Sequence, residues 1–264
     1  MVTIGVFGGS GFYEFGKDIK EVKVDTPYGL PSSSVFITNI EGKEVAFLPR
    51  HGENHSYPPH MINYRANVWA MKELGVKYLF GPCAAGSLQK KVKSGDIVFC
   101  DSFVDRTKGR IDTFYDGPIT THISVADPYC TDMRKVAFQA AQKLRLKHHK
   151  TGTVVVINGP RFSSKSESKW FTKMGWEVIN MTQYPEQVLA RELEMCYLNV
   201  SLITDYDCGL EDEVIPSNIQ EIVKVFKQNL SNLQHLLFKM ISMLPVEKEN
   251  CSCASTLTMS RFND

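Results

Sequence analysis

The chain has 264 residues, of which 43% are hydrophobic and 22% charged, and its 30 basic and 29 acidic side chains leave a formal net charge of +1. This composition excludes collagen-like, fibrous and intrinsically disordered classes. A balanced charge supplies no overall field for a nucleic-acid backbone or a membrane surface, so we expect neither partner, and any anion site must be local. The length fits one α/β domain, which we expect to cover residues 1–264.

The ends of the chain suggest no targeting or membrane segment. In the first residues, MVTIGVFGGSGFYEF, glycines interrupt the apolar run before a signal peptide could form. No stretch reaches the roughly 20 apolar residues that cross a bilayer. We therefore expect a cytoplasmic protein, in which residues 247–264 are a candidate for a loosely ordered tail.

Short β-rich runs alternate with amphipathic segments. In chain order the pattern predicts strands at 3–7 and 45–48, a helix at 62–74, strands at 78–81 and 96–99, a helix at 132–144, strands at 153–157, 177–179 and 200–204, and a long helix at 217–244. We expect Ser217 to cap the last helix and its apolar stripe to pack in the core. This alternation predicts an α/β fold around a largely parallel sheet.

Two loops that follow predicted strands have compositions typical of anion sites. In Gly8-Gly9-Ser10-Gly11 the small residues allow a close approach, and backbone N–H groups and the Ser10 hydroxyl can bind phosphate oxygens. Pro49-Arg50-His51-Gly52 offers a guanidinium fork beside a histidine, and His55 and His60 follow. Taken alone, the first loop also suits a tight turn and the second a solvated loop. The prolines disfavour a zinc site from the three histidines.

Two further segments place small or aromatic residues at strand ends. Residues 81–88 form a second small-residue turn that could supply main-chain donors. In residues 158–167 a strand ends and a polar helix begins, capped by Ser163 or Ser164. Phe162 lies at that strand end, where its ring could stack on a base or pack in the core.

Asp205 and Asp207 follow the apolar strand at 200–204. Carboxylates past a buried strand are costly unless they meet a cation, a donor or a proton. A capping or turn role for one of them is the plainer alternative.

Seven cysteines are too few and too scattered for a disulfide scaffold. Cys251-Ser-Cys253 is a C-x-C pair, but no second Cys or His pair stands at matched spacing, so we expect no metal site. Cys83 lies in the second small-residue turn, and an inert buried thiol is a commoner role for it than a nucleophile.

Taken together and in this order, the motifs resemble those of the trimeric purine nucleoside phosphorylase family, in its branch that acts on 5'-methylthioadenosine. The resemblance runs from Gly5 to about Leu244. Its motifs are Gly8 to Gly11, Pro49 to Gly52, Ala85-Gly86-Ser87-Leu88, Thr113 to Pro118, Gly159 to Ser163, Asn180-Met181-Thr182 with the following Pro185-Glu186, and Thr204 to Asp207. It implies a phosphorylase-type fold whose central sheet is mixed, largely parallel and flanked by helices.

The resemblance also implies an activity and the residues that perform it. Phosphate would attack the anomeric carbon of 5'-methylthioadenosine and release adenine and 5-methylthioribose 1-phosphate, with no cofactor beyond phosphate as co-substrate. The implied phosphate ligands are Ser10, Arg50, His51, Ala84 and Thr182. The implied nucleoside contacts are Met181 at the ribose, Phe162 and Ser163 at the base, His55 in the 5' pocket, His122 at a neighbouring subunit's site, and Asp205 and Asp207 at N7 and the 6-amino group.

An aspartic acid that protonates N7 near pH 7 needs a raised pKa, which burial beside a second carboxylate supplies. We expect Asp205 to set the choice between a 6-amino and a 6-oxo purine, because a carboxylate accepts from an amine. The resemblance further implies a homotrimer. Two positions depart from the family: Cys83 stands where relatives often have a hydroxyl, and Gly209 where many have Trp.

The resemblance also bears on the thiols. Cys130 and Cys196 occupy positions that form a bridge in some heat-adapted relatives, and the C-x-C resembles the tail of microbial members. Because intracellular disulfides are exceptional outside hyperthermophiles, we expect both pairs to be reduced.

Two alternatives to this activity stay open. The nearer one is a purine nucleoside phosphorylase that acts on inosine, guanosine or adenosine. The more distant one is a non-catalytic nucleotide-binding protein, which would not need Arg50, His51 and both carboxylates.

Overall fold

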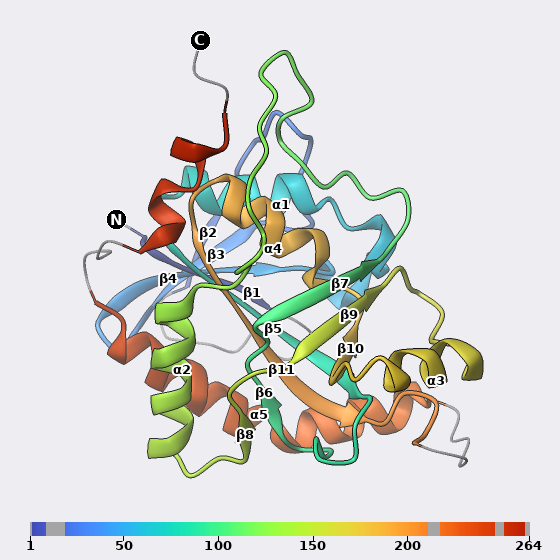
Figure 1. Cartoon of the computed structure of the whole chain (residues 1–264). Helices are drawn as coiled ribbons and strands as arrows, with labels where there is room; N and C mark the ends of the chain where they lie inside the picture. The colour runs from blue at the N-terminus through green and yellow to red at the C-terminus, as the bar shows by residue number, and fades with distance from the viewer. Residues whose placement is uncertain (1, 9–18, 211–216, 246–250, 262–264) are drawn as a thin grey trace.

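A computed structural model of the chain describes residues 2–8, 19–210, 217–245 and 251–261 (Figure 1). The described strands are β1 (Ile4–Gly8), β2 (Lys20–Val22), β3 (Val35–Ile40), β4 (Lys43–Pro49), β5 (Tyr78–Ser87), β6 (Ile97–Val98), β7 (Ser102–Arg106), β8 (His148–His149), β9 (Thr153–Ile157), β10 (Val178–Asn180) and β11 (Cys196–Asp205). The described helices are α1 (Tyr64–Glu73), α2 (Thr131–Lys143), α3 (Lys165–Lys173), α4 (Gln183–Glu192) and α5 (Ile219–Met243), with short 3-10 turns at Glu53–His55, Pro59–Met61, Ser252–Ser255 and Leu257–Met259.

The strands form one mixed, largely parallel sheet, as predicted. Its main path runs β2-β3-β4-β1-β5-β10-β9-β7, and β11 pairs with both β5 and β6. The pairs β1–β4, β1–β5, β5–β11, β9–β10, β7–β9 and β6–β8 are parallel. The pairs β2–β3, β3–β4, β5–β10 and β6–β11 are antiparallel. The central strands β1, β5 and β11 are buried almost throughout.

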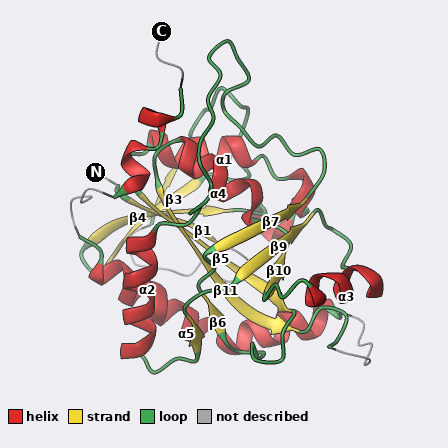
Figure 2. Cartoon of the chain, in the orientation of Figure 1, coloured by secondary structure: helices red, strands yellow, loops and turns green. Residues whose placement is uncertain are grey.

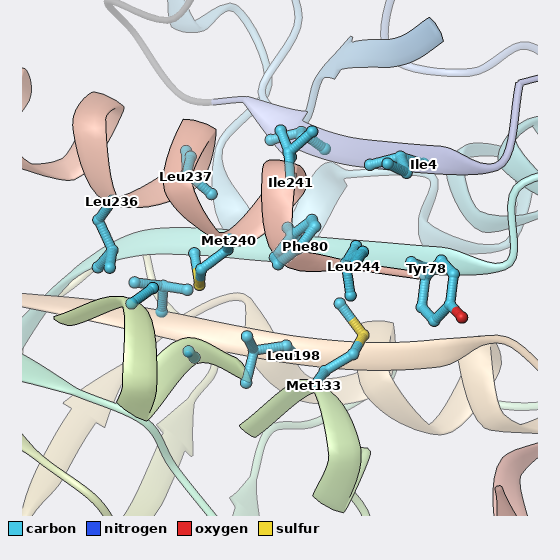
Figure 3. Packing of buried hydrophobic residues seen from close by; sticks show 14 of the residues in the cluster. Ile4, Tyr78, Phe80, Met133, Leu198, Leu236, Leu237, Met240, Ile241 and Leu244 are labelled. Atoms are coloured by element: carbon cyan, nitrogen blue, oxygen red, sulfur yellow. The ribbon is translucent and has the colours of Figure 1, made fainter. Parts of the chain in front are cut away.

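Helices cover both faces of this sheet (Figure 2). Consecutive strand residues point to opposite faces, so Phe80 packs under α2 and α5 while Leu79 packs under α1 and α4. Figure 3 shows the first of these clusters, where Met133 and Met240 meet strand side chains such as that of Leu198. The two clusters fix the central strands from both sides, so the loops at their ends have a firm base.

The sequence located α1, α2 and α5, and the start of α3 has the predicted cap. Ser164 caps α3, since its hydroxyl accepts from the backbone N–H of Glu167 while the Glu167 carboxylate accepts from that of Ser164. The prediction for α5 was wrong at its start: Asn218 caps the helix, and the Ser217 hydroxyl donates instead to the Asp207 carbonyl.

The apolar stripe of α5 is in the core only in part. Its second half is buried, through Leu233, Leu236, Leu237, Met240 and Ile241. In the first half, Ile219 and Val223 are 60% and 41% exposed. Among the described helices, none is long and apolar enough to cross a bilayer.

Candidate active site

The candidate site lies at the sheet edge where β1, β4, β5 and β11 end. These four strands run in parallel and share a carboxyl-terminal edge. Arg50 directly follows β4, and its backbone N–H donates to the Gly8 carbonyl at the end of β1, at 3.0 Å. Asp205 is the last residue of β11. Ligand sites of open α/β sheets form at such an edge.

Arg50 is a buried cation held by a buried anion. Its Nε and Nη2 donate to the two carboxylate oxygens of Glu186, at 2.6 and 2.9 Å, and Nη1 donates to the Pro82 carbonyl at 3.1 Å. Burial alone would lower the pKa of the guanidinium, but the charge and hydrogen bonds of Glu186 outweigh it and raise the pKa. Of the five N–H groups that arginine carries, these partners use three. The other two can meet an anion.

Glu186 lies on α4, and its side chain reaches the sheet because the residue of β5 that faces it is Gly81, which has no side chain. The Tyr197 hydroxyl donates to Glu186 at 2.6 Å. A Cβ atom at Gly81 would collide with the Tyr197 hydroxyl and lie 2.9 Å from a Glu186 carboxylate oxygen. The small residue in this strand therefore makes room for the ion pair that orients Arg50.

His51 and His55 stack on one another after β4, with ring centroids 4.0 Å apart. Nδ1 of His51 lies 2.9 Å from the Tyr57 carbonyl oxygen, and because a carbonyl only accepts, this nitrogen carries the proton. Burial, with His55 and Arg50 adding to its effect, lowers the pKa of His51 to about 3. His51 is therefore neutral near pH 7, and its Nε2 is an acceptor. Burial also lowers the pKa of His55.

Ala84 and Thr182 lie close in sequence to residues of a hydrogen-bonded cluster that contains two asparagine side chains and the Cys83 thiol. Ala84 is in β5, paired with Leu202 of β11. Beside it, the Cys83 sulfur accepts from the side-chain amides of Asn180 and Asn199, each at 3.4 Å. Thr182, which is buried, directly precedes α4. The backbone N–H groups of Thr182 and Gln183 donate to the side-chain oxygen of Asn180, at 3.4 and 3.5 Å, so the Thr182 hydroxyl is the group at this position that can meet a phosphate oxygen.

Met181 packs on the turn that precedes Phe162. Its sulfur would lie 2.7 Å from a Cβ at Gly159, so the turn and Met181 are in close contact. Arg110 ties the two segments together, because its Nη2 donates to the carbonyls of Asn158 and Met181, each at 2.8 Å. Phe162 itself is half-buried.

Asp205 and Asp207 form an acid pair at the end of β11, in which Asp207 is buried and Asp205 is half-buried. Asp205 Oδ1 accepts from the Thr204 hydroxyl at 2.8 Å, and Oδ2 accepts from the backbone N–H of Asp207 at 3.1 Å. Asp207 Oδ2 and the Ser163 hydroxyl are buried and have no hydrogen-bond partner of good geometry in the described structure. The Ser168 and Ser163 hydroxyls lie near enough to Asp207 to oppose the effect of burial on the pKa of its carboxyl. The Cys208 thiol donates to the Ser163 carbonyl at 3.0 Å, which brings Ser163 to the acid pair.

Burial raises the pKa of both carboxyls. For Asp205, the bonds from Thr204 and Asp207 N–H oppose this effect, while the neighbouring Asp207 charge adds to it. The direction agrees with the expectation of a carboxylic acid that can carry a proton.

Two of the predicted residues are not part of this group. Ser10 lies outside the described residues. His122 is exposed on the segment between β7 and α2, and its backbone N–H donates to the Ser260 carbonyl in the C-terminal tail at 2.8 Å. The prediction of a turn at residues 81–88 was wrong: β5 continues to Ser87 because these small residues pair with β11, so Ala84 lies inside the strand. The other predicted residues lie at strand ends and in the turns that border them.

Two side chains that position the candidate site were not predicted from the sequence. Glu186 had a signal, since Pro185-Glu186 belongs to a family motif, yet nothing in the sequence showed that it meets Arg50. Arg110 had none, because it donates mainly to backbone carbonyls, which any residue supplies, and to the hydroxyl of the sequence-distant Tyr64.

The chain belongs to the phosphorylase superfamily, whose family model matches residues 3–242. Among curated relatives, an S-methyl-5'-thioadenosine phosphorylase of Thermococcus kodakarensis is 49% identical over 97% of this chain and 98% of its own length. One of Thermofilum pendens is 46% identical over 97% of each chain. A relative called purine nucleoside phosphorylase, from Streptomyces coelicolor, is also 46% identical, over 96% of this chain and 94% of its own.

Solved structures agree with these matches. A methylthioadenosine phosphorylase of Schistosoma mansoni in complex with adenine superposes with a TM-score of 0.92 at 32% identity, covering 99% of each chain. A methylthioadenosine phosphorylase sourced from an Antarctic soil metagenomic library gives a TM-score of 0.92 at 33% identity, over 99% of this chain and 92% of that one. The same fold therefore extends over nearly the whole chain.

Proposed function

We propose that this protein cleaves 5'-methylthioadenosine with phosphate, to give adenine and 5-methylthioribose 1-phosphate. The observation that carries the proposal is that a fixed buried cation, Arg50, and an acid pair with raised pKa values, Asp205 and Asp207, stand at one edge of one sheet. A nucleoside phosphorylase needs both, because an anion attacks at one end of the reacting bond while the purine leaves at the other. The names of the relatives supply the substrate.

The phosphate end uses charge and positioned donors. Arg50 offers its two remaining N–H groups, and Ala84, Thr182 and Ser10 complete the set that the motifs imply. Neutral His51 presents an acceptor at Nε2, which pairs with a phosphate oxygen that carries a proton. Glu186 holds the guanidinium in one orientation, so no reorganisation is needed when phosphate binds.

The purine end uses the raised pKa values. As phosphate oxygen bonds to the anomeric carbon, the glycosidic C–N bond breaks and its electron pair moves into the purine. A protonated Asp205 donates its proton to N7, and neutral adenine leaves. The other oxygen of Asp205 accepts from the 6-amino group, and Asp207 Oδ2, which lacks a partner in the described structure, is a second acceptor for that group. Phe162 and Ser163 flank the base, Met181 lies against the ribose, and His55 lines the 5' pocket.

Substrate choice separates this function from its rival. The Streptomyces coelicolor relative favours a purine nucleoside phosphorylase, while the acid pair favours a 6-amino over a 6-oxo purine. The test is release of free base from 5'-methylthioadenosine, adenosine and inosine, each with and without phosphate. We expect the highest kcat/KM for 5'-methylthioadenosine and no release without phosphate. A preference for inosine would establish the rival, and no release from any of them would leave a non-catalytic binder.

The assembly that goes with this function is a homotrimer with shared sites. His122 supports it, because it is exposed on a segment that projects from the body of the chain (Figure 1). In a closed cyclic oligomer each subunit gives and receives the same contact, so lending one residue completes every site. A cytoplasmic location stays a prediction.

A further inference from the structure

We propose that Cys130, Cys196, Cys251 and Cys253 form a four-thiolate site for one Zn²⁺ ion, which fastens the C-terminal tail to the body of the protein. The site is separate from the catalytic edge. It would be structural, since four protein ligands leave no open position for a substrate.

The first support is geometric. The four sulfur atoms all lie within 4.8 Å of one another, and those of Cys196 and Cys251 are 3.2 Å apart. A tetrahedral zinc site with bonds of about 2.3 Å places its sulfurs about 3.8 Å apart, a value between the 3.2 Å of Cys196 and Cys251 and the 4.8 Å upper limit of the cluster. In a disulfide two sulfurs approach to about 2.05 Å, and all seven cysteines of this structure are free thiols.

The second support is how the thiols come together. Cys130 immediately precedes α2, Cys196 begins β11, and the other two lie in the tail at the turn Ser252–Ser255. Spacing along the chain could not reveal this, because only the C-x-C pair is local. The expectation of no metal site rested on that spacing.

The third support is burial. Cys130, Cys196 and Cys253 are 2%, 1% and 3% exposed, and Cys251 packs against the same cluster. The dry surroundings exclude competing water ligands. On binding Zn²⁺ the four thiols release their protons and the site carries two negative charges. The N-terminus of α2, which follows Cys130 directly, favours such charge.

Backbone contacts connect the C-terminal tail, which the zinc ion would fasten, to the segment that holds His122. Thr121 pairs with Arg261, and the His122 N–H donates to the Ser260 carbonyl. Arg261 also lies over the Tyr115 ring at 5.0 Å. Loss of zinc should therefore loosen the tail and expose the His122 amide, although the catalytic edge itself needs no metal.

The direct test is the zinc content of the full-length protein, purified with its thiols reduced and without chelator. We expect about one zinc per chain, and replacement by Co²⁺ should give the visible spectrum of a tetrahedral cobalt thiolate. Less than about one tenth of a zinc per chain together with no cobalt spectrum would overturn the proposal. The mass of protein prepared without reductant is a second check. A mass lower than that of the fully reduced chain by four hydrogens, which two disulfides would give, would also overturn the proposal.

Variants locate the site and test its effect. C251S/C253S should lose the zinc, while C208S, a thiol outside the cluster, should keep it. Hydrogen exchange at the His122 amide should become at least about tenfold faster in C251S/C253S, because its acceptor is in the tail. Full zinc content in C251S/C253S would refute the assignment. If this variant does not fold, the cobalt spectrum of the wild-type protein still decides.

Discussion

The sharpest question at the scale of single residues is which carboxyl reads the purine. Asp205 was expected to set the choice, but both of its oxygens accept from groups of the chain, whereas Asp207 Oδ2 has no partner in the described structure. The structure is therefore consistent with either carboxyl as the group that selects the purine. Only a comparison of the variants D205N and D207N distinguishes the roles of the two residues.

D205N removes the acid that protonates N7 and supplies a donor in its place. We expect it to lose most turnover on 5'-methylthioadenosine. We also expect the ratio of kcat/KM for inosine over adenosine to rise by about 10- to 150-fold, since a mispaired polar group in a dry pocket costs about 1 to 3 kcal/mol. Steady-state kinetics of D205N and D207N decide. If D207N alone moves the ratio, the roles are exchanged, and if neither does, the base is recognised elsewhere.

His51 makes stability depend on pH. Its pKa is about 3 when folded and about 6.5 when unfolded, so the unfolded chain binds the proton more tightly. The stability it contributes is complete above about pH 6.5 and is lost as the pH falls from there towards 3. The expected loss by pH 5 is about 1 kcal/mol, after allowance for the partial exposure of the ring.

H51N tests this effect, because an asparagine amide can still donate to the Tyr57 carbonyl. The free energy of unfolding in urea should fall less in H51N than in the wild-type protein between about pH 7.5 and 5. Parallel pH curves for the two proteins would show that His51 titrates normally.

At the scale of elements, the ion pair between Glu186 of α4 and Arg50, which directly follows β4, holds the end of that strand against the helix. E186Q keeps the shape of the side chain and removes its charge, so Arg50 is left as an uncompensated buried cation. We expect a loss of roughly 3 to 5 kcal/mol in unfolding free energy and a rise of at least about tenfold in the KM for phosphate, because the fork is no longer aimed.

E221Q is the matched control for this prediction. Glu221 pairs with Lys224 at the surface, where both side chains are more than half exposed. Such a pair contributes about 0.2 to 1 kcal/mol, so the control should behave as the wild-type protein does. Equal stability and equal phosphate KM for E186Q and E221Q would refute the role of the ion pair.

The sequence predicted the elements that have a strong period and missed those that depend on tertiary context. Helices α1, α2 and α5 are amphipathic and were located, whereas α4 contains Pro185 and was not predicted. β7 has no strong alternation and is ordered mainly by its parallel pairing with β9. The motifs located most of the candidate site. The resemblance placed Cys130 beside Cys196, but the partners of Arg50 and the approach of Cys251 and Cys253 to that pair could not be predicted, because they join residues far apart in the chain.

At the scale of the whole molecule, we predict that the protein is a homotrimer in solution. Light scattering coupled to gel filtration should give about three times the chain mass of 29.8 kDa. H122A should remain a trimer and lose kcat/KM, since it removes only the lent side chain. An active monomer would contradict shared sites, and an unaltered H122A would remove His122 from them.

The central claim is that phosphate, and not water, cleaves the glycosidic bond of 5'-methylthioadenosine. The most direct measurement follows the reaction by phosphorus NMR while adenine is quantified in the same sample. The account predicts one new sugar 1-phosphate for each adenine released, and no adenine when phosphate is omitted. Release of adenine with free methylthioribose and no phosphorylated sugar would contradict it.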